Sequence, residues 1–330
     1  MIELPDLAPF QAFERYAIEL LVDLSRLLTV EKSDVPVVRL EVTPDGDGSR
    51  SEAVTTWVAR NWGIEPGEGV IRLPRSALAA ITAVAGLLAE QETTTADRYG
   101  RVPPEANALV AAGLERTPVI SAAGRALAKA ARRAAGRRPV RFVAPWPEGK
   151  RWAVALTHDL DVVDWWPAFT ALRLVELAKR GQFGRMMRVL SASAHAGILR
   201  RPVERALESL IASESARGLR STWFILCGTP TFTTMRAGDL TYRPEGTSAR
   251  RLLTAMANSG GEFGLHGSFE TFSEPAAFVR QRERLGQLTG RPIMGVRQHF
   301  LRLRPGATQR EMAAHGFDYD ASIGFPDRNG

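Results

Sequence analysis

The residues best suited to chemistry follow one apolar run near the middle of the chain. The run Trp152 to Leu156 has the composition of a buried strand, and it continues as Thr157-His158-Asp159-Leu160-Asp161. Because side chains alternate along a strand, Asp159 and Asp161 are predicted to share one side and His158 to face the other. Paired carboxylates at the end of a parallel strand suit catalysis or metal binding. The same residues would also fit a purely structural role, in which the strand ends and an aspartate caps the following helix.

Three further polar motifs are predicted to lie where strands end. They run from His266 to Glu270, from Arg297 to His299 and from Asp318 to Asp320. The carboxyl ends of parallel strands meet at one face, so these side chains could converge. Carboxylates with imidazoles suit a divalent metal such as zinc, cobalt or nickel, which polarises a carbonyl and acidifies a water. A second carboxylate could accept the water proton, and an arginine could hold that base ionised and oriented.

The second half of the chain alternates predicted strands with predicted helices. Repeated strand-helix units predict an α/β fold with a parallel sheet, either open or closed into a barrel. The expected strands are 152–157, 221–226, 262–266, 293–297 and one from 319, and the expected helices lie within 164–195 and at 202–217, 247–258, 275–289 and 307–314.

The first half has a different pattern. Phenylalanines and leucines at helical spacing predict a helix over 1–30, and a strand at 35–42 and helices at 74–91 and 121–135 follow. Residues 137–150 are rich in proline and predict a linker. We therefore expect a smaller α+β accessory domain over 1–145 and a (β/α) barrel-like domain over 146–330.

The composition indicates a soluble globular protein. The chain has 330 residues, 45% of them hydrophobic and 24% charged, which fits about two domains. It contains no apolar run of 18 residues, so no transmembrane helix is predicted. The first residues lack the pattern of a signal peptide. Cys227 is the single cysteine, so an intrachain disulfide is excluded. A cytoplasmic location is expected from the absence of such signals.

A cluster of basic residues over 125–141 accounts for part of the net charge of +7. Such a cluster can bind nucleic acid or an anionic surface. No aromatic interleaving, zinc-finger spacing or RNA-binding signature accompanies it, so a solvated helix face is favoured and no nucleic-acid partner is predicted.

The order of the motifs resembles the polysaccharide deacetylases of carbohydrate esterase family four, the nodulation-protein-B homology domain. Thr157 to Asp161 is similar to that family's Thr-Phe-Asp-Asp motif, in an Asp-x-Asp form. Gly261 to Ser268 resembles its Gly-His-Glu-Ile-Gly-x-His strand, and Gly295 to Arg297 resembles its third motif. Residues 221–224 and 317–322 are similar to further strands of the family, and the resemblance covers about 150–330. The residues of these motifs resemble those of a bacterial subgroup of the family that carries an extra N-terminal domain.

This resemblance implies a metal-dependent hydrolase that removes N- or O-acetyl groups from a carbohydrate, with a divalent cofactor such as zinc, cobalt or nickel. It implies that Asp159 is the catalytic base, that Asp161 and His266 are metal ligands, and that Arg297 orients the base.

The chain departs from the family pattern at the third ligand. The position of the family's second metal histidine is Glu270 here, so we expect Glu270 to complete the site, with His299 as the alternative. His299 is also a candidate for protonating the leaving group. The chain stops at Gly330, before the family's last motifs, so a C-terminally truncated barrel is expected. The alternatives are a different metal-dependent hydrolase and a pseudo-deacetylase that binds carbohydrate or acts as a scaffold without catalysis.

Overall fold

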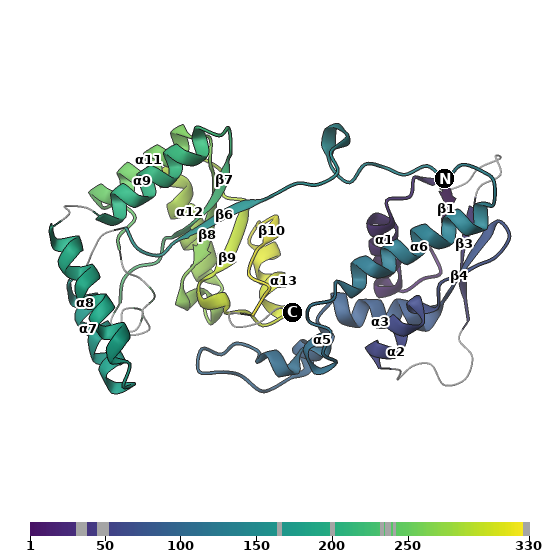
Figure 1. Cartoon of the computed structure of the whole chain (residues 1–330), viewed down its shortest axis with the longest axis horizontal. Coiled ribbons are helices and arrows are strands. Elements are labelled where there is room, and N and C mark those ends of the chain that lie inside the picture. Colours follow the sequence, from purple (N-terminus) through teal and green to yellow (C-terminus); the bar gives the residue numbers. More distant parts are fainter. Residues whose placement is uncertain are drawn as a thin grey trace. The chain divides into compact units, whose positions relative to one another are not determined.

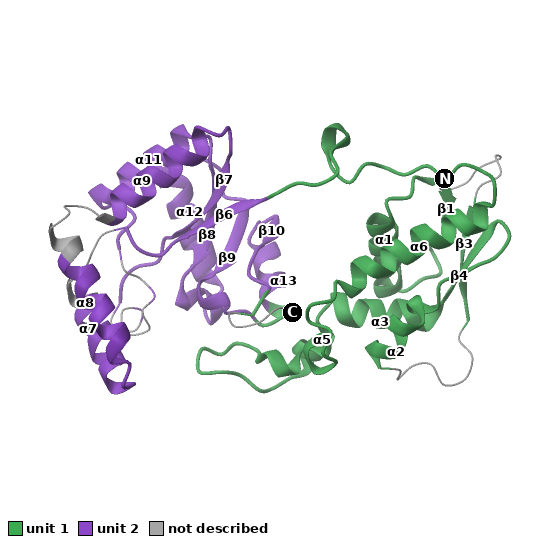
Figure 2. Cartoon of the chain, viewed as in Figure 1, with its two compact units in different colours: residues 1–154, 304–307, 324–330 green, residues 155–303, 308–323 purple. Residues whose placement is uncertain are grey.

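The computed structural model describes residues 1–30, 38–44, 53–163, 167–198, 202–231, 234, 239 and 242–325. The chain divides into two compact units (Figure 2). Unit 1 comprises residues 1–154, 304–307 and 324–330, and unit 2 comprises residues 155–303 and 308–323. Within the described residues, every helix is too short or too polar to cross a membrane.

Unit 1 is a mixed five-stranded sheet with helices packed on it. Its strands lie in the order β2-β1-β3-β5-β4, and all neighbours are parallel except β4 and β5. The strands are β1 (Ile2–Glu3), β2 (Thr29–Val30), β3 (Val38–Thr43), β4 (Glu65–Pro66) and β5 (Val70–Pro74). The helices are α1 (Ala12–Ser25), α2 (Val54–Ala59), α3 (Arg75–Ala85), α4 (Leu88–Glu92), α5 (Ala108–Ala111) and α6 (Val119–Ala135) (Figure 1).

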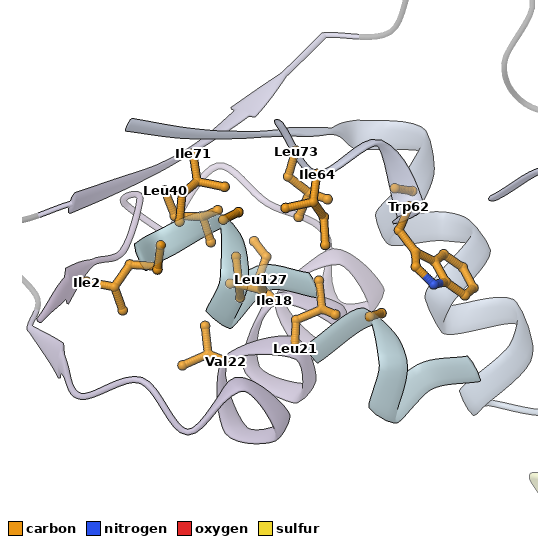
Figure 3. Close-up of a cluster of buried hydrophobic side chains, with 14 of the residues drawn as sticks. Ile2, Ile18, Leu21, Val22, Leu40, Trp62, Ile64, Ile71, Leu73 and Leu127 are labelled. Carbon is orange, nitrogen blue, oxygen red and sulfur yellow. The ribbon is translucent and has the colours of Figure 1, made fainter. Parts of the chain in front are cut away.

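The core of unit 1 lies between its sheet and helices α1 and α6. Figure 3 shows Leu21 of α1 and Leu127 of α6 among the buried side chains of this core. Gly124 lets the two helices approach, because a Cβ atom there would lie 2.4 Å from the Cβ atom of Leu24. Apolar burial of this kind provides most of the favourable free energy of folding.

Two predicted helices of unit 1 are wrong in extent. The helix predicted over 1–30 covers only Ala12–Ser25, because Ile2–Glu3 and Thr29–Val30 pair as strands and Arg26 ends the helix with a φ of 59°. The helix predicted over 74–91 is divided between α3 and α4, because Leu87 has a left-handed φ of 56°.

Unit 2 contains a five-stranded parallel sheet in the sequential order β6-β7-β8-β9-β10. This arrangement confirms the predicted α/β class with a parallel sheet. The strands are β6 (Leu156–Leu160), β7 (Ser221–Leu226), β8 (Glu262–Gly267), β9 (Gly295–Gln298) and β10 (Tyr319–Asp320). The helices are α7 (Pro167–Lys179), α8 (Phe183–Ile198), α9 (Pro202–Ser215), α11 (Thr247–Asn258), α12 (Ala276–Thr289) and α13 (Ala307–Ala314). The described strands form an open order with β6 and β10 at its ends, so a closed barrel stays a prediction.

The first strand of unit 2 lies further along the chain than predicted. Its pairing with β7 begins at Leu156, opposite Ser221, and continues to Leu160. The buried strand predicted for Trp152 to Ala155 is therefore wrong: Trp152 is 75% exposed and Val154 is 68% exposed. Consequently Thr157, His158 and Asp159 belong to the strand itself.

Alternation along the strands places the helix-covered core on one face of the sheet and the candidate reactive residues on the other. Trp223, Phe263 and Val296 belong to one hydrophobic core with residues of α11 and α12, including Leu252 and Phe278. The alternate positions Asp159, Phe224 and Gly264 are aligned in register across β6, β7 and β8. Polar side chains that could react therefore lie on the face opposite the helix-covered core.

Candidate metal centre and catalytic site

Three side chains from three different segments meet near the C-terminal ends of β6, β8 and β9. Asp161 directly follows β6, His266 is on β8, and His299 opens the short 3-10 helix η6 (His299–Leu301) after β9. One potential ligand atom of each lies within 4.8 Å of the others. The Oδ1 atom of Asp161 is 3.3 Å from Nε2 of His266 and 3.7 Å from Nε2 of His299.

The two imidazoles are held by their other ring nitrogens. Nδ1 of His266 lies 2.8 Å from the backbone oxygen of Arg297, which can only accept, so this nitrogen carries a hydrogen. Nδ1 of His299 lies 2.6 Å from Oδ1 of Asp239, a fully buried carboxylate. Both histidines are buried, and both direct Nε2 at Asp161.

The carboxyl group of Asp161 has a lowered pKa. Burial acts to raise that pKa, but the hydrogen bond with His266 and the charges of His266 and His299 outweigh it, and the pKa lies below its ordinary value of 3.8. Asp161 is therefore an anion at neutral pH. Its side chain is 48% exposed as a whole, although Oδ1, the atom that faces the two histidines, is buried.

One carboxylate and two imidazoles match the ligands that zinc and similar divalent metals prefer. Two imidazole Nε2 atoms and a carboxylate oxygen point at one another from three segments, and a cation among them would be attracted by all three. The donor set therefore fits a divalent metal site, and three protein ligands leave a position for water or substrate.

A second pair of charged side chains lies on the same face. NH1 of Arg297 donates to Oδ1 of Asp159 at 2.7 Å, and NH2 donates to the hydroxyl of Thr157 at 3.1 Å. Nε of Arg297 donates to the backbone oxygen of Ala321 at 3.1 Å, and the guanidinium lies 4.4 Å from the ring centre of Phe224. These contacts fix the carboxylate of Asp159 on the strand that precedes Asp161.

The structure brings together five of the six residues predicted for the site, in two neighbouring groups. Glu270 lies in the 3-10 helix η5 (Phe269–Phe272) and is not part of the three-residue cluster found among the described residues. Burial raises the pKa of Glu270, and the negative charges of Glu274 and Asp239 add to this effect. His299 occupies the place beside Asp161 and His266 that the alternative interpretation gave it.

Asp239 has no counterpart in the sequence analysis. It follows no predicted strand and belongs to no motif, so its type and spacing gave no signal. Asp320, in the last motif, accepts a hydrogen bond from the backbone N–H of Ser322 at 2.8 Å and so stabilises its own turn.

His158 faces away from this site, as its alternation with Asp159 predicted. Its Nε2 lies 2.8 Å from Glu214, which also accepts from the hydroxyl of Ser221 at 2.8 Å, and its ring lies 4.3 Å from that of Trp223. These contacts tie β6 and β7 to the end of α9.

Comparison with known proteins gives little further information. No protein-family model matches the chain, and no curated protein matches it. Among solved structures, the chain is similar to a Mycobacterium smegmatis protein that carries the provisional name of polysaccharide deacetylase. The identity is 22%, the TM-score is 0.32, and the match covers 54% of this chain and 54% of that one, so it spans about half of each.

Proposed function

We propose that unit 2 is a metal-dependent hydrolase that removes N- or O-acetyl groups from a carbohydrate. The observation that carries the proposal is the cluster of Asp161, His266 and His299 beside a carboxylate, Asp159, that an arginine fixes. The motif order of the sequence suggests an acetylated carbohydrate as the substrate class, and the geometry of the site supports hydrolysis as the reaction type.

Asp161, His266 and His299 are proposed to hold zinc, or cobalt or nickel in its place. His299 takes the third position instead of Glu270, because its Nε2 belongs to the group of ligand atoms within 4.8 Å. A metal bound there would polarise the acetyl carbonyl, stabilise the oxyanion and acidify the attacking water.

Asp159 is proposed to accept the proton of that water. The bond from Arg297 occupies Oδ1 of Asp159, which leaves Oδ2 to receive the proton. Once protonated, Asp159 can return the proton to the leaving nitrogen or oxygen of the sugar. Arg297 acts by keeping the carboxylate in one orientation throughout.

The test is the metal content of the purified full chain, measured by elemental analysis. We expect about one equivalent of metal in the wild type and in Glu270→Ala, and loss of that metal in Asp161→Ala, His266→Ala and His299→Ala. Retention in His299→Ala with loss in Glu270→Ala would instead make Glu270 the third ligand.

Hydrolysis is tested on acetylated oligosaccharides with the metal-loaded wild type, and acetate release is measured. Activity that disappears in Asp161→Ala supports a metal-dependent deacetylase. A wild type that binds no metal after metal is added back would contradict the proposal and would favour carbohydrate binding without catalysis.

A further inference from the structure

Asp239 makes two charge-assisted contacts from a fully buried position beside the candidate metal centre. Its side chain is 0% exposed. Oδ1 lies 2.6 Å from Nδ1 of His299, and Oδ2 accepts the backbone N–H of Phe269 at 2.8 Å. A buried carboxylate that meets two N–H groups is held in one orientation by both.

The first contact determines which nitrogen of His299 carries the hydrogen. An ionised carboxylate can only accept, so Nδ1 of His299 is the donor. Nε2, the other ring nitrogen of His299, lies 3.7 Å from Oδ1 of Asp161. His266 donates from Nδ1 in the same way, to the backbone oxygen of Arg297.

The backbone after His299 restrains the same ring from its face. Phe300 and Leu301 have φ values of 60° and 54°, a left-handed conformation that side chains other than glycine adopt at an energetic cost. This turn stacks the ring of Phe300 on the imidazole of His299, with centres 4.0 Å apart and planes inclined by 18°. Phe300 therefore limits tilting of the ring, while Asp239 determines its rotation and its tautomer.

We infer that Asp239 is a positioning residue, which holds the Nδ1–H of His299 and so directs Nε2 of that ring at Asp161 and His266. The expected effect on metal affinity rests on the proposed function, whereas the position of the hydrogen on His299 does not. Carboxylate partners of metal-binding histidines raise metal affinity by about 10–100-fold, and we expect an effect of this size.

The tautomer can be measured directly in the metal-free full chain. Two-bond ¹H–¹⁵N NMR of ¹⁵N-histidine-labelled protein shows which ring nitrogens of each histidine carry a hydrogen. His299→Gln assigns the signal. The wild type is expected to show Nδ1–H at His299. Asp239→Asn is expected to change this ring toward Nε2–H, because the backbone N–H of Phe269 takes the amide oxygen and the amide nitrogen that then faces His299 cannot accept.

Two controls come from the same site. His266 should keep its Nδ1–H form in Asp239→Asn, because its acceptor is a backbone oxygen. The second control is Glu274→Gln, which removes a negative charge that acts on Glu270. Because Glu274 pairs with Arg280, this substitution should leave His299 unchanged.

Zinc and cobalt affinities of the same variants, measured by competition with a chromophoric chelator, test the consequence. Asp239→Asn should bind about 10–100-fold more weakly than the wild type and Glu274→Gln. A His299 without a hydrogen on Nδ1 in the wild type would overturn the inference without any variant, as would an unchanged hydrogen position in folded Asp239→Asn. A wild type that binds no metal but shows the tautomer change would leave the role of Asp239 intact and contradict the proposed function.

Discussion

The guanidinium of Arg297 on β9 bonds the carboxylate of Asp159 on β6 at 2.7 Å, although β7 and β8 lie between these strands. Neighbouring strands are about 4.8 Å apart, so a flat sheet would separate the two backbones by about 14 Å. Phe224 of β7 lies beneath the guanidinium, 4.4 Å away. The long arginine side chain therefore reaches over β8 and the ring of Phe224 and brings the base and its arginine together.

Replacing Arg297 with lysine should reduce acetate release by about 10–100-fold while the metal content stays the same. Lysine cannot reproduce the fork that contacts Asp159, Thr157 and Ala321 together. The metal should stay because His266 is held by the backbone oxygen of residue 297, which the substitution keeps. Thr157→Val, which removes one of these contacts, should have a smaller effect. Loss of metal in Arg297→Lys would show that the side chain also supports the ligands.

Replacing Asp159 with asparagine should reduce the rate of hydrolysis by about 10²–10⁴-fold, the usual contribution of a general base. Asparagine keeps the size of the side chain but accepts no proton. Metal content and the thermal unfolding midpoint, measured on the same samples, should match the wild type. Full activity in metal-loaded Asp159→Asn would remove Asp159 from the mechanism.

Gly295→Ala should destabilise unit 2 by about 1–3 kcal/mol, as overpacking usually does. A Cβ atom at position 295 would lie 2.1 Å from the ring of Tyr319, whose hydroxyl donates to Glu262 at 2.8 Å. Gly184→Ala is the control, because a Cβ atom there meets no other atom within 4 Å and alanine favours its helix α8. Urea unfolding of the three proteins gives the comparison, and equal midpoints for Gly295→Ala and Gly184→Ala would contradict the close packing of Tyr319 on β9.

The ion pair of Glu14 and Arg75 should make the stability of unit 1 depend on pH. The hydrogen bond from Arg75 lowers the pKa of Glu14 from its ordinary 4.5, burial opposes this, and the backbone N–H of Gln11 adds to the lowering. NH2 of Arg75 lies 2.8 Å from Glu14, whose side chain is almost fully buried. Since the folded-state pKa is the lower one, the stabilisation is complete above the unfolded value and is lost as pH falls through the folded value.

Glu14→Gln should therefore destabilise unit 1 at pH 7 by about 1–3 kcal/mol, the usual worth of hydrogen bonds to a charged group. The difference from the wild type should narrow as the pH is lowered below about 4.5. Glu19→Gln, at an exposed position of the same helix, should unfold like the wild type at each pH. A difference that stays constant from pH 7 to about 3 would contradict the assignment.

Local sequence patterns predicted much of unit 2. The runs over 221–226 and 262–266 are strands within one residue of the predicted bounds, because short apolar segments bounded by glycine and polar turns leave few alternatives. The apolar run Trp152 to Leu156 has the same composition, but its first four residues lie outside the sheet, since a strand also needs a neighbour with which to pair.

The sequence by itself determined which residue types were available and on which strands or strand ends they would lie: Asp159, Asp161, His266, Arg297 and His299. Only the tertiary structure decided that His299, instead of Glu270, lies beside Asp161 and His266, and that Asp239 holds His299. The physical reason is that alternation along a strand is a local property. Contacts between strands that are not neighbours and between loops depend on how distant segments pack and on backbone turns such as that of Phe300 and Leu301, which no short segment encodes.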